Sequence, residues 1–307
     1  MDEIYNLIGD FPNKIKNAYS TNVDLRLKKF DKMIFFGMGG SYISSLVLKE
    51  FLNEKIFVEV NPSNFFVDSS TLFVLISYSG NTKEILVVLE KLKNRTRNIL
   101  ILSSGGELGK KAEKYDIDLI KIPCEIHQRF TFAYVFFPLL KLFEKSDLTE
   151  SKLKCIWEIL NAERKNIEKI TRNLANKIND KNLLIYASPF FYPVAYRFQT
   201  AVEEDAKTIC HSNKISELFH NELEALPDKR FFPILILDKK EMKNYDRQIQ
   251  YFKKKLNSFY EFGFEKYSKE ERIFLAFYFI DFFGYYLSKI KKADMGQTPL
   301  SDKIKKL

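Results

Sequence analysis

Three short hydroxyl side chains stand between an apolar run and an amphipathic one. Residues 71–76 (TLFVLI) form the run of β-branched and apolar residues that is typical of a buried strand. The hydroxyls that follow are Ser77, Ser79 and Thr82. A helix is predicted next, with Asn81 and Glu84 spaced as its N-cap and N3 residues. A hydroxyl-rich turn at a helix N-terminus favours phosphate binding, because backbone N–H groups and the helix dipole attract an anion; an ordinary capped loop is the alternative.

Two further loops carry small residues after apolar runs. Gly37, Gly39, Gly40 and Ser41 follow the first run, and SSGG at residues 103–106 follows another. The first loop is not a dinucleotide fingerprint, because Tyr42 stands where G-x-G-x-x-G requires a glycine. No G-K-[ST] follows either, which excludes a nucleotide P-loop. Gly40 and Ser41 therefore belong to a glycine turn at which the backbone can approach a ligand.

The elements that must position these loops alternate between strand and helix. Strands are predicted at 32–36, 56–60, 71–76, 98–102 and 118–122, with helices between most of them and a polar helical stretch over residues 1–30. This alternation is typical of a parallel sheet covered on both faces. The three loops should then lie along one carboxyl edge, where ligands bind in such sheets.

The second half of the chain repeats the alternation after a polar stretch at 145–151. A long helix is predicted at 152–178, strands at 183–187, 232–237 and 259–264, and helices at 193–207, 219–225, 243–256 and 270–289. We therefore expect two α/β domains, residues 1–147 and 148–290, and a polar C-terminal tail at 291–307.

Composition limits the class of protein. The 307 residues are 46% hydrophobic and 29% charged, which is ordinary for a globular chain, and the net charge is +9. The lysines are scattered and accompany no nucleic-acid motif, so a solvated surface is favoured over nucleic-acid binding. Three cysteines without a C-x-x-C pair, and no signal peptide, indicate free thiols in the cytoplasm. The apolar segment 273–287 contains Asp281, and a buried helix is favoured over a membrane span.

The loops together resemble a known family. FFGMGGS (35–41), LISYSGNTKE (75–84) and LSSGGELGKKA (102–112), in this order and spacing, are similar to the sugar isomerase (SIS) domain. More narrowly, the chain resembles the bifunctional phosphoglucose/phosphomannose isomerases. The segments of the second half that carry this resemblance are Tyr196-Arg197, EDAK (204–207), ELFHNE (217–222), Thr298-Pro299 and Lys305. The chain departs from the family pattern at Tyr42, Asp205, Phe219 and His127-Gln128.

The resemblance implies a fold of two SIS (flavodoxin-like) subdomains and an activity. The activity is the interconversion of glucose 6-phosphate, and of mannose 6-phosphate, with fructose 6-phosphate through a cis-enediol. It implies no metal and no other cofactor. Proton transfer requires a phosphate site that orients the substrate, a base, and a cation near the developing enediolate.

The same resemblance implies roles for individual residues. Ser77, Ser79 and Thr82, with Gly40 and Ser41, would hold the phosphate. Glu204 would be the general base, with neighbouring Glu203 as the residue most easily mistaken for it, and Arg129 the enediolate cation. His220 and Lys305 would open the sugar ring, with Lys303 and Lys306 as alternatives to Lys305. Thr298 would handle the C2 epimer. The family's histidine reaches the neighbouring subunit's site, which implies a homodimer.

Three other functions remain open at this point. A non-catalytic SIS module that senses a sugar phosphate would keep the serine loops but would not need Glu204, His220 and Lys305. A SIS isomerase of another phosphosugar would share the first half and diverge in the second. A nucleic-acid binder would use the +9 charge and would bind random DNA with a steep dependence on salt.

Overall fold

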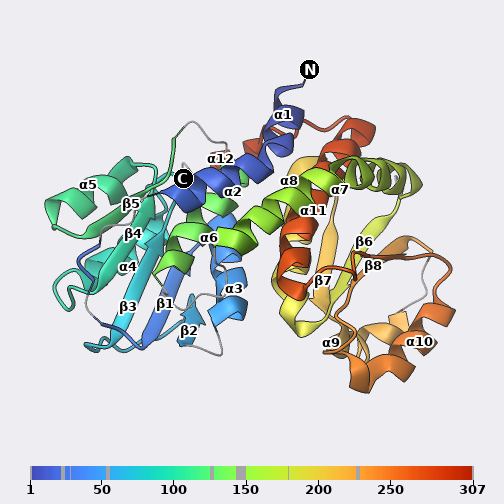
Figure 1. Ribbon diagram of the computed structural model, residues 1–307, viewed down its shortest axis with the longest axis horizontal. Coiled ribbons are helices and arrows are strands. Elements are labelled where there is room, and N and C mark those ends of the chain that lie inside the picture. Colours follow the sequence, from blue (N-terminus) through green and yellow to red (C-terminus); the bar gives the residue numbers. More distant parts are fainter. Residues whose placement is uncertain are drawn as a thin grey trace. The chain divides into compact units, whose positions relative to one another are not determined.

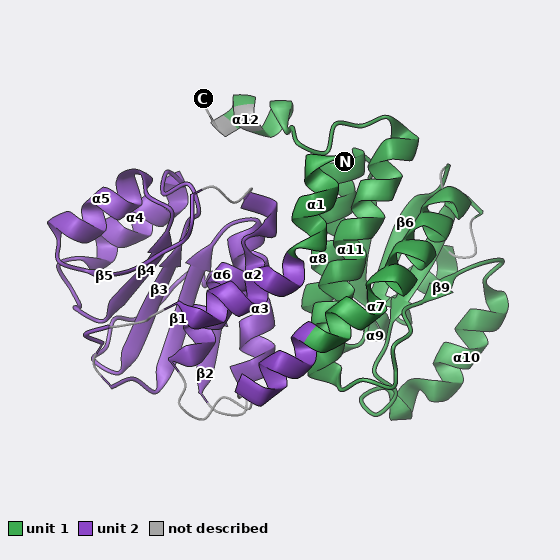
Figure 2. Ribbon diagram, turned by 45° about the horizontal axis from the view of Figure 1, so that its top comes forward, with its two compact units in different colours: residues 1–10, 158–307 green, residues 11–157 purple. Residues whose placement is uncertain are grey.

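The computed structural model describes residues 2–21, 25–27, 29–52, 56–124, 128–142, 150–178, 180–225 and 229–305. They form two compact units (Figures 1 and 2): unit 2 is Phe11–Trp157, and unit 1 combines Met1–Asp10 with Glu158–Leu307. The predicted boundary at residues 147 and 148 lies outside the described residues. Each unit has its own sheet and core.

Unit 2 is built on a five-stranded parallel sheet in the order β2-β1-β3-β4-β5. The strands are β1 (Lys32–Gly37), β2 (Phe57–Val60), β3 (Thr71–Ile76), β4 (Ile99–Ser103) and β5 (Asp118–Lys121). All six residues of β3 are buried, as expected for a central strand covered on both faces. This order reverses between β1 and β3, which makes their carboxyl ends the switch point of the sheet.

Helices cover both faces of this sheet. They are α2 (Phe11–Ser20), α3 (Gly40–Leu52), α4 (Lys83–Leu92), α5 (Gly106–Lys114) and α6 (Phe132–Lys141), with the short 3-10 helix η1 (Gln128–Phe130). The apolar faces of α4 and α5 pack on one side of the sheet, where Ile85, Leu89 and Leu108 join strand residues in one core cluster. α2, α3 and α6 lie on the other side (Figure 1).

Unit 1 has a four-stranded parallel sheet in the order β7-β6-β8-β9. The strands are β6 (Asn182–Ala187), β7 (Cys210–Lys214), β8 (Phe231–Ile236) and β9 (Tyr260–Glu261). The helices are α1 (Glu3–Gly9), α8 (Tyr192–Ala206), α9 (Ile215–Leu218), α10 (Asp246–Lys255), α11 (Lys269–Lys291) and α12 (Pro299–Lys305), with the short helices η2 (Pro189–Phe191), η3 (Glu222–Ala225) and η4 (Lys243–Tyr245). α7 (Glu150–Lys177) contains the boundary between the units. The prediction of two α/β subdomains with parallel sheets is confirmed.

The apolar segment 273–287 lies inside the long helix α11, which begins at a capping box of Ser268 and Glu271. α11 is long and apolar enough to cross a membrane by composition, yet 83% of its most apolar window is buried. It packs against α8, and a buried ion pair of 2.8 Å joins Arg197 to Asp281 between the two helices. The interpretation of a buried core helix is confirmed.

Several predicted elements were wrong in type or extent. The strand β7 was not predicted, because its sequence CHSNK has no apolar alternation. The helix expected at 219–225 is instead a turn followed by η3, and the strand expected at 259–264 is reduced to the two residues of β9. The helical stretch expected over 1–30 ends at Ser20, and the tail contains α12.

Candidate functional site

The three small-residue loops of unit 2 follow β1, β3 and β4, which are neighbours in the sheet. Their carboxyl ends therefore lie side by side at one edge, as the sequence predicted. Ser77, the first residue after β3, is 3% exposed, and its N–H donates to the carbonyl of Leu102 at 3.1 Å. The hydroxyl-rich loop thus begins from a fixed, buried position at the switch point of the sheet.

The hydroxyl of Ser77 lies 2.7 Å from the hydroxyl of Thr82. Thr82 is the N-cap residue of α4, but its side chain makes this contact and not a capping bond to the helix. The prediction of Asn81 as the N-cap was wrong: its side-chain oxygen accepts a 3.1 Å hydrogen bond from the N–H of Glu107 at the start of α5. Two facing hydroxyls beside a helix N-terminus are suited to binding a phosphate.

The rest of this loop is held by its neighbour after β4. The N–H of Leu108 donates to the carbonyl of Gly80 at 2.8 Å, and the hydroxyl of Ser104 donates to the carbonyl of Tyr78 at 2.6 Å. Gly80 has a φ of +68°, and an added Cβ would lie 1.8 Å from the carbonyl oxygen of Gly105. The two loops are therefore fixed to each other. Ser79 remains exposed at the tip, where its hydroxyl accepts from the N–H of Asn81 at 3.2 Å.

The glycine turn after β1 completes this edge. Gly39 has a φ of +57°, which favours glycine, and the exposed Gly40 opens α3, with Ser41 half-buried beside it. An added Cβ on Gly40 would lie 3.9 Å from the carbonyl oxygen of Gln128, so η1 passes close to the turn. Arg129 on η1 is buried. His127 lies outside the described residues.

In unit 1, Glu204 is exposed in the last turn of α8. The side chain of Lys207, which was not among the predicted site residues, donates to the carbonyl of Glu204 at 2.5 Å and to the carbonyl of Gln297 at 2.7 Å. These bonds tie the end of α8 to the segment that carries Thr298. The neighbouring Glu203 accepts a 3.2 Å bond from Gln199 along the helix surface.

His220 lies on an exposed turn after α9. Glu204 precedes the amino end of β7 and His220 follows its carboxyl end. Because β7 has five residues, those two ends are about 13 Å apart. Glu204 thus lies before the amino end of β7 and is linked to the segment of Thr298, while His220 lies beyond the carboxyl end of that strand. Lys305 is the last residue of α12.

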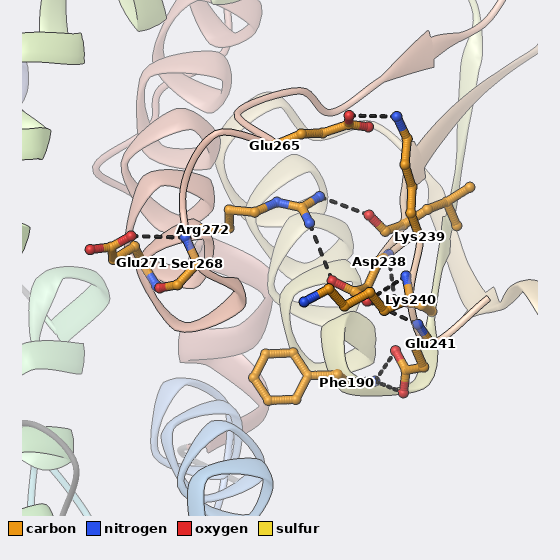
Figure 3. Close-up of polar contacts among 11 residues, drawn as sticks. Phe190, Asp238, Lys239, Lys240, Glu241, Glu265, Ser268, Glu271 and Arg272 are labelled. Atoms are coloured by element: carbon orange, nitrogen blue, oxygen red, sulfur yellow. Dashed lines mark hydrogen bonds and ion pairs between the residues drawn. The ribbon is translucent and has the colours of Figure 1, made fainter. Parts of the chain in front are cut away.

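The carboxyl edge of the sheet in unit 1 has a different character (Figure 3). The N–H of Phe190, in η2 after β6, donates to both carboxylate oxygens of Glu241, at 3.1 and 3.2 Å. Buried Arg272 donates to the carbonyl of Leu237 at 2.7 Å and lies 3.6 Å from the carboxylate of Asp238. Burial lowers the pKa of the Arg272 guanidinium. At this edge the N–H of Phe190 and the guanidinium of Arg272 thus donate to acceptors of the chain itself.

The residues that were not predicted from the sequence mostly hold the site segments in place. Ser104 and Lys207 fix the segments that carry predicted site residues, through the bonds described above. The signal for Ser104 was present in the SSGG loop, which was predicted to lie at the ligand-binding edge without a role for this serine. Lys207 lies within the EDAK segment, where its position three residues after Glu204 places its side chain near the last carbonyls of the helix.

Comparisons with known proteins agree with this architecture. The family model of the SIS domain matches residues 26–137, and that of the bacterial phospho-glucose isomerase C-terminal SIS domain matches residues 167–307. A bifunctional phosphoglucose/phosphomannose isomerase of Thermoplasma volcanium is 30% identical over 95% of this chain and 96% of its own. A D-glucosamine-6-phosphate 4-epimerase of Sulfolobus acidocaldarius is 30% identical over 68% of this chain and 70% of its own. The solved structure of glucosamine-6-phosphate deaminase from Thermotoga maritima has a TM-score of 0.77 at 16% identity, covers 97% of this chain and 98% of its own, and supports the fold.

Proposed function

Because this chain belongs to the family of bifunctional phosphoglucose/phosphomannose isomerases, we propose that it interconverts glucose 6-phosphate and mannose 6-phosphate with fructose 6-phosphate. The observation that carries the proposal is the pair of hydroxyls, Ser77 and Thr82, that face each other at the switch point of the sheet, beside the N-terminus of α4. Such a site holds a phosphate by the end of the substrate that does not react. Binding energy then orients the carbons that do react.

The proton transfer is assigned to Glu204. Its carboxylate takes the proton from C2 of the aldose, which leaves a cis-enediol, and returns that proton to C1. The O2 hydroxyl gives up its proton and O1 gains one, so that the ketose is an isomer of the starting sugar. Arg129 supplies the positive charge that stabilises the enediolate. Arg129 is buried, and a guanidinium presents a planar set of donors to oxygens that carry negative charge.

Ring opening is assigned to His220 and Lys305, and the C2 epimer to Thr298. The position of Glu204 before the amino end of β7, and of His220 after its carboxyl end, supports a homodimer in which each His220 serves the neighbouring subunit's site. The exposure of both residues fits this arrangement. All three cysteines are free thiols, as expected for an enzyme of the reducing cytoplasm.

The first experiment is an assay of the purified protein with fructose 6-phosphate and EDTA, in which glucose 6-phosphate and mannose 6-phosphate are followed separately. Both products are expected. Glucose 6-phosphate alone would keep the mechanism and remove the role of Thr298. Binding of fructose 6-phosphate without either product would favour the sensor.

Because one relative is named for a different reaction, a second substrate should be tested in the same way. The 30% identical epimerase of Sulfolobus acidocaldarius is named for D-glucosamine 6-phosphate. Incubation with that sugar, followed by separation of the C4 epimers, should give no product if the isomerase proposal holds. Epimerisation without isomerisation of fructose 6-phosphate would overturn it.

A further inference from the structure

The carboxylate of Glu222, two residues after His220, is bound by side chains from two neighbouring strands. One of its oxygens accepts a 2.6 Å hydrogen bond from the hydroxyl of Tyr186, near the end of β6. The other accepts a 2.5 Å bond from the side-chain amide of Asn213 on β7, and the imidazole of His211 lies 3.5 Å away. One side chain on η3 is thus bound to two strands of the sheet.

The residues around Glu222 divide into anchored and exposed positions. Leu218 is buried, and Phe219 and Leu223 pack against the same core cluster, which includes Tyr186. His220 and Asn221, between them, are exposed, although the N–H of His220 donates to the carbonyl of Glu217 at 3.0 Å. The turn therefore has an apolar side fixed to the core and a polar side that presents the histidine.

Apolar packing alone would leave this short segment with rotational freedom, because α9 has four residues and η3 also has four. Hydrogen bonds to a charged acceptor are stronger and more directional than apolar contacts. Tyr186 is buried on β6, a central strand of the sheet, so its bond ties Glu222 to the core of the unit.

We propose that Glu222 is a positioning residue for the isomerase reaction, and that its carboxylate, held by Tyr186 and Asn213, fixes the turn that presents His220. The inference rests on the function proposed for His220. It adds a residue that does not touch the substrate but determines where the imidazole can reach.

The kinetic test compares Glu222→Ala with Glu224→Ala, because Glu224 is an exposed glutamate of the same 3-10 helix. Loss of Glu222 should lower kcat on fructose 6-phosphate about 10- to 100-fold with little change in KM, the scale of a misplaced catalytic group. Glu224→Ala should match the wild type. Glu222→Gln should restore part of the loss, since an amide can still accept from Asn213 and donate to the oxygen of Tyr186.

A double mutant separates positioning from general support. If Glu222 acts through His220, Glu222→Ala should reduce the activity of His220→Ala only slightly further. A full additional 10- to 100-fold loss in that background would overturn the inference, and so would an unchanged kcat in Glu222→Ala alone.

A measurement without catalysis keeps the inference testable even if the protein proves inactive on these sugars. Hydrogen–deuterium exchange of the peptide over residues 215–225 should be faster in Glu222→Ala and in Tyr186→Phe than in the wild type, and unchanged in Glu224→Ala. Equal exchange in all four proteins would exclude a positioning role. Inactivity of the wild type with the predicted exchange would instead reject the proposed function alone.

Discussion

The two sheets of this protein place a serine at the same point and use it differently. Ser77 follows β3 and Ser188 follows β6, and both are buried. The N–H of Ser77 donates to the carbonyl of Leu102 on β4 at 3.1 Å, and the N–H of Ser188 donates to the carbonyl of Ile236 on β8 at 3.0 Å. The hydroxyl of Ser77 faces that of Thr82. The hydroxyl of Ser188 instead accepts from the N–H of Asp238 at 3.1 Å.

The difference extends to the helix that follows each serine. In unit 2 the hydroxyl of the N-cap Thr82 is turned towards Ser77 and away from the first backbone N–H groups of α4. In unit 1 the carboxylate of Glu241 is bound to the N–H of Phe190, where an anion would sit, and Arg272 is bound to Leu237 and Asp238 (Figure 3). A carboxylate of the chain thus fills one edge, while hydroxyls leave the other suited to a ligand.

In both units the carboxyl edge of the parallel sheet supplies backbone N–H donors. The side chains of the loops determine whether a group of the chain or a ligand accepts from these donors. In unit 1 the candidate base Glu204 precedes the amino end of β7, and His220 follows the carboxyl end of that strand. We therefore expect changes at the edge of unit 2 to affect substrate binding, changes at Glu204 to affect turnover, and changes at Ser188 and Glu241 to affect stability alone.

The largest expected effect is that of Glu204→Gln. Loss of a general base should lower kcat by roughly two to four orders of magnitude, with little change in KM for fructose 6-phosphate. Glu203→Gln is the matched control, because Glu203 is also exposed and interacts along the helix surface. Steady-state kinetics of both variants decide the assignment, and near-normal turnover in Glu204→Gln would reject it.

The next effect should come from Gly80→Ala. At a φ of +68°, with the new Cβ 1.8 Å from the carbonyl oxygen of Gly105, the two loops of unit 2 must move apart. We expect a loss of about 1–3 kcal/mol in the free energy of unfolding and a raised KM. Gly109→Ala is the control, since a Cβ there meets nothing within 4 Å; equal behaviour of the two variants in thermal unfolding would contradict the fixed loop.

A smaller effect should distinguish the roles of Ser77 and Ser188. Ser77→Ala removes a phosphate ligand and should raise KM for fructose 6-phosphate about tenfold, the value of one hydrogen bond to a charged group, with kcat nearly unchanged. Ser188→Ala should leave both constants at the wild-type level and lower the melting temperature instead. If Ser188→Ala raised KM as much as Ser77→Ala, the two edges would not differ in the way proposed here.

Much of unit 2 was predictable because its central strands are continuous apolar runs. Residues 71–76 and the Gly/Ser loops indicated both the sheet and the edge at which Ser77 and Thr82 meet, since the carboxyl ends of parallel strands must lie together. The residue-level roles of Glu204 and His220 came from resemblance and remain predictions.

The parts that were missed depend on tertiary contacts. β7 is an edge strand whose alternating burial uses Cys210 and Ser212, so its pattern is invisible to a hydrophobicity rule. Asn81 has a side chain that is typical of an N-cap, yet it accepts a hydrogen bond from the N–H of Glu107 at the start of α5. Neither pairing can be read from local spacing, because each partner is distant in the chain.

The smallest expected effect concerns the edge of unit 1, where Glu241 accepts from the N–H of Phe190. Glu241→Gln keeps the size of the side chain and one acceptor, but weakens the bond from the N–H of Phe190 by removing its charge. We expect a loss of about 1 kcal/mol or less in the free energy of unfolding, the scale of one helix cap, with kcat and KM unchanged. Chemical denaturation measures the first and the fructose 6-phosphate assay the second. A changed KM in Glu241→Gln would mean that the edge of unit 1 takes part in binding, and the contrast between the two sheets would have to be abandoned.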